Sequence, residues 1–137
     1  MLAFLSKIFG YFVRRRGSRF DSGVEPAKNV GLPVISVGNL SMGGTGKTPM
    51  IAALCELIIE MGYRPGIIGR GYKKKQRGTV IVSDGDAILS DARRAGDEML
   101  MLARKCRVPV IADEIKSRAA EEMARHFRPD CIIVDDG

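Results

Sequence analysis

One stretch of the sequence combines glycines, a lysine and a threonine in the order that a phosphate-binding loop requires. Glycines allow the backbone to turn with its N–H groups pointing inward around a phosphate, and the helix that follows adds partial positive charge. The lysine ammonium can reach the terminal phosphate oxygens, and the threonine hydroxyl can ligate Mg²⁺. We therefore predict that a nucleotide binds with Mg²⁺ at Ser41, Met42, Gly43, Gly44, Thr45, Gly46, Lys47 and Thr48, with Thr48 also a metal ligand.

Two adjacent aspartates follow an apolar run near the end of the sequence. Asp135 and Asp136 come directly after residues 131–134, Cys-Ile-Ile-Val. A carboxylate at the C-terminal end of a strand is the usual companion of a phosphate loop, where it holds Mg²⁺ or a water bound to it. We predict that both aspartates are metal ligands, and the alternative is a plain turn after a strand.

A basic cluster begins directly after the apolar segment 65–69. Arg70 comes first, and Lys73, Lys74 and Lys75 follow it. In a parallel sheet the strand ends face the ligand, so we predict that Arg70 contacts a phosphate group of the nucleotide. For the three lysines, phosphate contact and a solvated charged loop both stay open.

Asp97 precedes a helical pattern and has two possible roles. Its carboxylate could cap the N-terminus of that helix, where negative charge is favourable. It could also take part in catalysis. The residues of this segment alone favour the capping role over the catalytic one.

Apolar strands and amphipathic helices alternate along the chain and position these residues. A helix begins at Lys47, with Met50, Ile51 and Ile58 on its apolar face, and Gly62 ends it. Further helices begin near Asp97 and after residue 113. We predict an α/β fold, a three-layer domain of the P-loop NTPase type whose mostly parallel sheet lies between helices. The predicted strands are 33–37, 65–69, 79–83, 107–112 and 129–135.

The N-terminal segment carries most of the net charge of +6, with five basic residues and no acid in residues 1–20. A nucleic-acid binder would spread its basic charge over a folded face, so we predict a local anionic partner and no nucleic acid. Apolar residues in this segment recur at spacings of three and four, which predicts an amphipathic helix on an anionic membrane surface. A helix packed on the protein or on a partner is the alternative. No stretch reaches the roughly 18 to 20 apolar residues that cross a bilayer.

Four motifs occur in an order that resembles the tetraacyldisaccharide 4′-kinase family of the lipid A pathway. Members of that family transfer the γ-phosphoryl group of ATP to a disaccharide hydroxyl. Ser41 matches the family at a position where general phosphate loops have glycine, whereas Met99 stands where the family usually has proline. The motifs are Val37-Gly-Asn-Leu-Ser-Met-Gly-Gly-Thr-Gly-Lys-Thr-Pro49, Gly69-Arg-Gly-Tyr72, Ala95-Gly-Asp-Glu98 and Ile133-Val-Asp-Asp-Gly137.

The resemblance implies an ATP-dependent lipid kinase that phosphorylates the 4′-hydroxyl of a tetraacyl disaccharide 1-phosphate. It implies ATP and Mg²⁺ as cofactors and an acylated disaccharide as the substrate. Asp97 becomes the candidate base that orients or deprotonates the acceptor hydroxyl, and Asp135 and Asp136 become the second acidic pair. The resemblance also implies a peripheral protein on the cytoplasmic side of the inner membrane.

Members of the family are much longer and continue with Phe-Gln-His after the last motif. We therefore expect residues 1–20 to form the membrane-surface helix, 21–32 a connector, and 33–137 a nucleotide-binding domain truncated at its C-terminus. Such a chain would be inactive alone as a lipid kinase. Two alternatives stay open, namely a P-loop ATPase or GTPase that acts as a nucleotide-dependent membrane switch, and a nucleotide-binding fragment without turnover.

Overall fold

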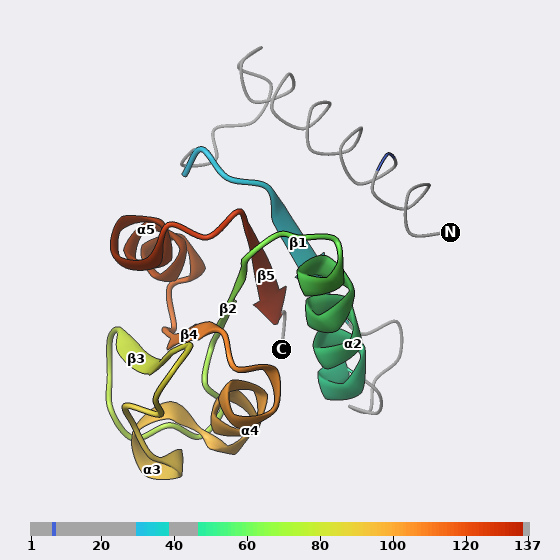
Figure 1. Ribbon diagram of the computed structural model, residues 1–137. Coiled ribbons are helices and arrows are strands. Elements are labelled where there is room, and N and C mark those ends of the chain that lie inside the picture. Colours follow the sequence, from blue (N-terminus) through green and yellow to red (C-terminus); the bar gives the residue numbers. More distant parts are fainter. Residues whose placement is uncertain (1–6, 8–29, 39–46, 136–137) are drawn as a thin grey trace.

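The computed structural model describes residue 7, residues 30–38 and residues 47–135 (Figure 1). The predicted N-terminal helix, residues 41–46 of the predicted phosphate loop and Asp136 lie outside these ranges. The elements of the described residues are β1 Val34–Val37, α2 Lys47–Glu60, β2 Pro65–Gly69, β3 Val80–Asp84, α3 Ala92–Ala95, α4 Asp97–Cys106, β4 Pro109–Ala112, α5 Lys116–Phe127 and β5 Cys131–Asp135.

The strands form one sheet in the order β1-β5-β2-β4-β3. Strands β1, β5, β2 and β4 are parallel, whereas β3 pairs antiparallel with β4. The loop after β2 stays at the carboxyl edge of the sheet, because β3 begins with Val80 opposite Ala112, the last residue of β4. From that edge β3 runs back across the sheet. The prediction of an α/β fold with a mostly parallel sheet is confirmed.

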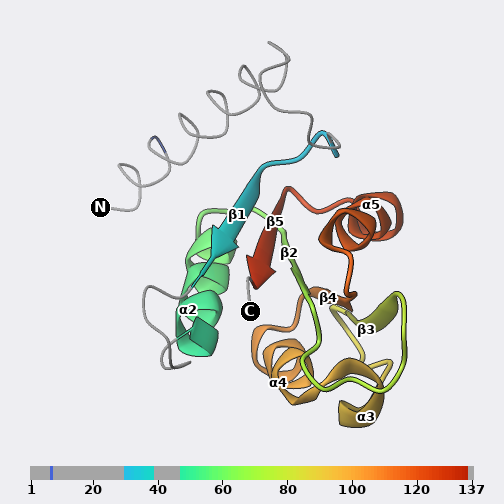
Figure 2. The same cartoon turned by 180° about the vertical axis from the view of Figure 1, so that it is seen from behind.

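Helices cover both faces of the sheet, as Figures 1 and 2 show. Along β5, Cys131 and Ile133 point into a core with α2 and α4, and Ile132 and Val134 point into a second core with α5. This alternation is the period of two that a strand imposes. Burying one isoleucine side chain contributes roughly 1.5–3 kcal/mol, so the two cores hold the three predicted layers together.

Helix α2 begins at Lys47, as predicted, and its buried face includes Ile51, Cys55 and Ile58. Met50 was predicted on this face but is 60% exposed. The helix rests on the sheet along a narrow stripe, and Met50 lies outside it. After the helix, the N–H of Gly62 donates to the carbonyl of Ile59 at 2.9 Å, which confirms the predicted end. No helix among the described residues is long and apolar enough to span a membrane.

The chain turns sharply at Gly96, between α3 and α4, with φ at 89°. A Cβ atom on Gly96 would lie 2.7 Å from the carbonyl oxygen of Tyr72 and 3.1 Å from the carbonyl carbon of Gly71. Backbone meets backbone here, so only glycine permits this approach. The contact holds the loop after β2 directly against the start of α4.

We expect Gly96→Ala to destabilise the fold far more than Gly62→Ala. Both glycines have positive φ, 89° and 87°, but a Cβ on Gly62 would have nothing within 4 Å. Gly62→Ala should cost about 1–2 kcal/mol for its left-handed backbone alone. Gly96→Ala should cost at least about 2 kcal/mol more, because backbone atoms must move apart. Urea unfolding of both variants measures the difference, and equal losses would show that the loop yields freely.

Candidate functional site

A nearly buried ion pair joins the first residue of α2 to the last residue of β5. Asp135 follows Cys131 and Ile133 on the face of the sheet that α2 covers. The Nζ atom of Lys47 lies 3.0 Å from Oδ1 of Asp135, and the two side chains are 10% and 5% exposed. The contact is an ion pair without hydrogen-bond geometry. Asp135 Oδ1 is buried and has no hydrogen-bond partner among the described residues. This oxygen therefore keeps unused accepting capacity.

Each partner of this pair depends on the other. An ion removed from water carries a desolvation cost that its counter-ion must offset, and deleting one partner of a buried pair costs roughly 3–5 kcal/mol. A ligand that takes Lys47 away must therefore supply a positive charge to Asp135. A phosphate with a bound divalent cation meets both requirements, since it brings anionic oxygens and a cation together.

Two further predicted residues, Arg70 and Thr48, lie near the same edge of the sheet. Asp135 pairs in register with Val37 of β1 and Gly69 of β2, so the ends of three parallel strands lie side by side. Arg70 directly follows β2 and is exposed, and Thr48 lies in the first turn of α2. The structure thus brings these residues to the carboxyl ends of parallel strands, the edge at which open α/β sheets bind ligands.

Asp97 is the first residue of α4, and its carboxylate does not cap the helix. The N-cap is Gly96, which has no side-chain cap bond, so the capping interpretation is wrong. The sharp turn at Gly96 places Asp97 one residue too late to cap, although Asp97 and Glu98 do supply acidic charge to the first turn. The carboxylate is exposed and has no polar partner among the described residues.

Lys74 has a structural role that the sequence left open. Its side chain is 4% exposed, and its Nζ lies 2.9 Å from Oε2 of Glu114 and 3.0 Å from the carbonyl oxygen of Gly78. The N–H of Gly78 also donates to Glu114 Oε1 at 3.0 Å. Together the hydrogen bonds from Lys74 and Gly78 lower the pKa of Glu114 to about 2. The amine is therefore used in closing the loop 70–78, whereas Lys73 and Lys75 are exposed.

Asp113, at the end of β4, is a further charged residue that the sequence analysis missed. Its buried carboxylate accepts from the Arg118 guanidinium at 2.6 Å, from Thr79 Oγ1 at 2.6 Å and from the N–H of Ile115 at 2.8 Å. Burial acts to raise the pKa of Asp113, but these hydrogen bonds outweigh it and lower the pKa to about 2. An aspartate directly after an apolar strand, the pattern that singled out Asp135, could have indicated it.

Of the three predicted Mg²⁺ ligands, the structure describes Thr48 and Asp135. Thr48 and Asp135 offer oxygen donors of the kind that Mg²⁺ prefers, and Asp135 Oδ1 is the buried acceptor without a hydrogen bond. Within residues 30–38 and 47–135, no three His, Cys, Asp or Glu side chains are grouped so that they could hold a metal ion. The residues present fit a cation that shares its coordination with phosphate oxygens and water.

Comparisons with known proteins identify close similarity along the whole chain. The family described as tetraacyldisaccharide-1-P 4′-kinase (LpxK) matches residues 1–137. A tetraacyldisaccharide 4′-kinase of Idiomarina loihiensis is 40% identical over 138 residues, which cover 100% of this chain and 41% of that protein. One of Chlorobium luteolum is 38% identical over 133 residues, covering 94% and 38%.

A crystal structure shares the fold. LpxK from Aquifex aeolicus, in its "apo" form in complex with ATP, superposes with a TM-score of 0.75 and 35% sequence identity. The match covers 99% of this chain and 43% of that one. The chain therefore spans about two fifths of the length of the relatives it matches.

We expect Lys74→Met to loosen the loop 70–78 and Lys73→Met to leave it unchanged. The first change removes a buried ammonium from its acceptors on Glu114 and Gly78 and should cost roughly 2 kcal/mol, whereas the second, at an exposed side chain, should cost less than about 0.5 kcal/mol. Limited trypsin digestion at Arg70 and Arg77, with urea unfolding, measures both effects. The charge swap Lys74→Glu with Glu114→Lys should restore part of the protection. Equal cleavage of both single variants would contradict the structural role of Lys74.

Proposed function

The chain belongs to the tetraacyldisaccharide-1-P 4′-kinase family, and we propose that it supplies the ATP site and the catalytic base of such an enzyme. The proposed reaction transfers the γ-phosphoryl group of ATP to the 4′-hydroxyl of a tetraacyl disaccharide 1-phosphate in lipid A synthesis. Because the chain spans about two fifths of its relatives, the activity is proposed for the longest natural chain that contains it.

The observation that carries this proposal is the ion pair between Lys47 and Asp135 at the carboxyl edge of the sheet. The pair brings the lysine of a glycine-rich loop close to a carboxylate at the end of a strand. A nucleotide with Mg²⁺ requires both groups in one place, the lysine for its phosphates and the carboxylate for its cation. In the proposed complex, Lys47 contacts the β- and γ-phosphates, while Thr48, Asp135 and Asp136 hold Mg²⁺ directly or through water. When bound, this cation neutralises charge on the phosphate oxygens.

Arg70 and residues 41–46 complete the proposed nucleotide site. The Arg70 guanidinium has no ion pair among the described residues, and its place after β2 puts it next to the strand that carries Asp135. Its planar donors suit a phosphate group. The backbone N–H groups of residues 41–46 would surround the phosphates in the manner of a P-loop.

Asp97 is the proposed base. Its carboxylate is exposed and unpaired among the described residues, and Gly96 holds it beside the loop that carries Arg70. A carboxylate in this position can accept the proton of an acceptor hydroxyl and orient its oxygen toward the γ-phosphorus. The match to this family favours a kinase over a nucleotide-dependent membrane switch. The exposed, unpaired carboxylate of Asp97 agrees with a kinase, because a switch needs no base for an acceptor hydroxyl.

We further propose that residues 1–20 bind the cytoplasmic surface of the inner membrane. The support is the pattern of the sequence, with apolar residues spaced by three and four and four arginines close behind them. A kinase whose acceptor is an acylated disaccharide must meet that acceptor where its acyl chains are buried.

We expect Lys47→Met and Asp97→Asn to separate ATP binding from phosphoryl transfer. In the longest natural chain, Lys47→Met should lower ATP affinity by about tenfold or more, because the phosphates lose the ammonium group of Lys47. Asp97→Asn should keep ATP affinity but lower kcat by about a hundredfold or more, because an amide accepts no proton. Calorimetry measures binding, and phosphate transfer to the tetraacyl disaccharide 1-phosphate measures turnover.

The Lys47 variant leaves Asp135 as an unpaired buried charge, so Lys47→Met with Asp135→Asn serves as its folded control. Asp97→Asn removes no cap and should leave the unfolding free energy nearly unchanged. Parental turnover in Asp97→Asn would remove Asp97 from the mechanism. Unchanged ATP affinity in both Lys47 variants would refute the proposed nucleotide site.

We expect deletion of residues 1–20 to release the protein from anionic vesicles. Flotation with vesicles of anionic phospholipid compares the intact and shortened proteins, and neutral vesicles are the control. Added salt should weaken binding of the intact protein, because it screens the arginines from the lipid phosphates. The same flotation before and after deletion would instead assign this segment to packing.

A further inference from the structure

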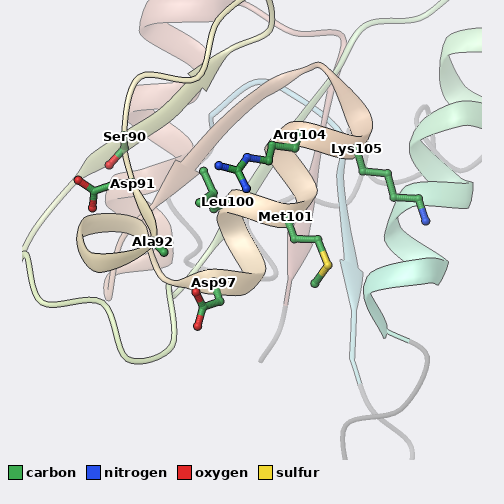
Figure 3. Close-up of a pocket in the computed structure, with 8 residues that line it drawn as sticks. All are labelled: Ser90, Asp91, Ala92, Asp97, Leu100, Met101, Arg104 and Lys105. Carbon is green, nitrogen blue, oxygen red and sulfur yellow. The ribbon is translucent and has the colours of Figure 1, made fainter.

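An open pocket of about 690 Å³ lies along the outer side of α4 (Figure 3). One wall is α4, and the other is the chain segment that enters α3. Asp97, the proposed base, lies at the end of the pocket where α4 begins. The lining includes Ser90, Asp91, Asp97, Met101, Arg104 and Lys105.

Arg104 brings a cationic side chain to the far end of the pocket. Arg104 and Lys105 lie in the last turn of α4, are exposed, and form no ion pair with the described residues. Lys74 and Arg118, by contrast, each contact a carboxylate. In Figure 3 the Arg104 side chain extends toward the wall that carries Ser90. The helix dipole favours basic residues here, but it leaves their side-chain donors unused.

The opposite wall adds a hydroxyl group. Ser90 Oγ is buried without a hydrogen-bond partner among the described residues, although buried hydroxyls normally have one. The nearby Asp91 carboxylate is already engaged, because its Oδ1 accepts from the N–H of Arg94 at 2.9 Å. The unused guanidinium donors of Arg104, on the side that faces Ser90, suit an anion with several oxygens, such as a phosphate group, whereas Lys105 extends the other way, toward α2.

The two ends of the pocket match the two ends of the proposed acceptor. Asp97 and Arg104 are two helical turns apart on one face of α4, a rise of about 10 Å. The acceptor carries its reacting 4′-hydroxyl on one sugar ring and its 1-phosphate on the other, so these groups lie at opposite ends of two linked rings. Between the two ends, Met101 is 49% exposed and offers an apolar contact for the rings.

We propose that this pocket binds the acceptor disaccharide, with Arg104 on the 1-phosphate and Asp97 at the 4′-hydroxyl. The inference rests on the proposed function and adds the residues that recognise the acceptor. It assigns selectivity for a phosphorylated acceptor to the end of α4 that is far from the nucleotide site.

The test compares two acceptors in the longest natural chain, the tetraacyl disaccharide 1-phosphate and the same disaccharide without its phosphate. Arg104→Gln should raise KM for the phosphorylated acceptor by about tenfold or more, as loss of charge-assisted hydrogen bonds predicts. KM for the other acceptor and KM for ATP should stay near their parental values. Arg93→Gln is the matched control, because Arg93 is an exposed arginine on α3 outside the pocket lining.

Each outcome decides the inference. Loss of selectivity in Arg104→Gln but not in Arg93→Gln supports it. Equal changes in KM for both acceptors, or no change, overturn it while the proposed function stands, since the parent still transfers phosphate. No transfer to either acceptor by the parent would overturn the proposed function and this inference together.

Discussion

The ion pair between Lys47 and Asp135 is the constraint on which the carboxyl edge of the sheet depends. A lysine and an aspartate this deeply buried are tolerated only as partners, so the start of α2 and the end of β5 have to meet. The register of β5 with β1 and β2 then fixes where the three strand ends lie. At the proposed site, nucleotide binding would exchange the partners of this ion pair, because Lys47 and Asp135 already contact each other.

Three aspartates near this edge show that surroundings decide the role of a carboxylate. Asp113 is saturated by Arg118, Thr79 and a backbone N–H, so it fastens β4 to the start of α5. Asp135 has a cationic partner but still has one oxygen without a hydrogen bond. Asp97 has no polar partner among the described residues. Of these three carboxylates, only that of Asp97 is free to accept a proton, and only that of Asp135 is suited to share a cation.

Local patterns predicted much of this arrangement. The apolar run before Asp135 predicted β5, and Gly62 predicted the end of α2, because both depend on neighbours in sequence. The antiparallel direction of β3 depends on where the loop after β2 lies. The residues of β3 themselves do not indicate the direction of the strand. Lys73 and Lys74 look alike in sequence, yet a positive φ of 62° at Lys73 turns the chain so that Lys74 alone enters the loop interior. The resemblance to known kinases, rather than its surroundings in sequence, singled out Asp97.

The strand order also has a consequence for the synthesis of the protein on the ribosome. Strand β5 lies between β1 and β2, although both are made long before it. Until β5 has emerged, β1 has no neighbour among the described strands and Lys47 has no Asp135 to meet. Non-local parallel pairing of this kind forms slowly, and the waiting strands expose apolar surface. The edge of the sheet that carries Lys47 and Asp135 is therefore completed only after β5 has emerged, later than the pairing of β2, β3 and β4 can begin.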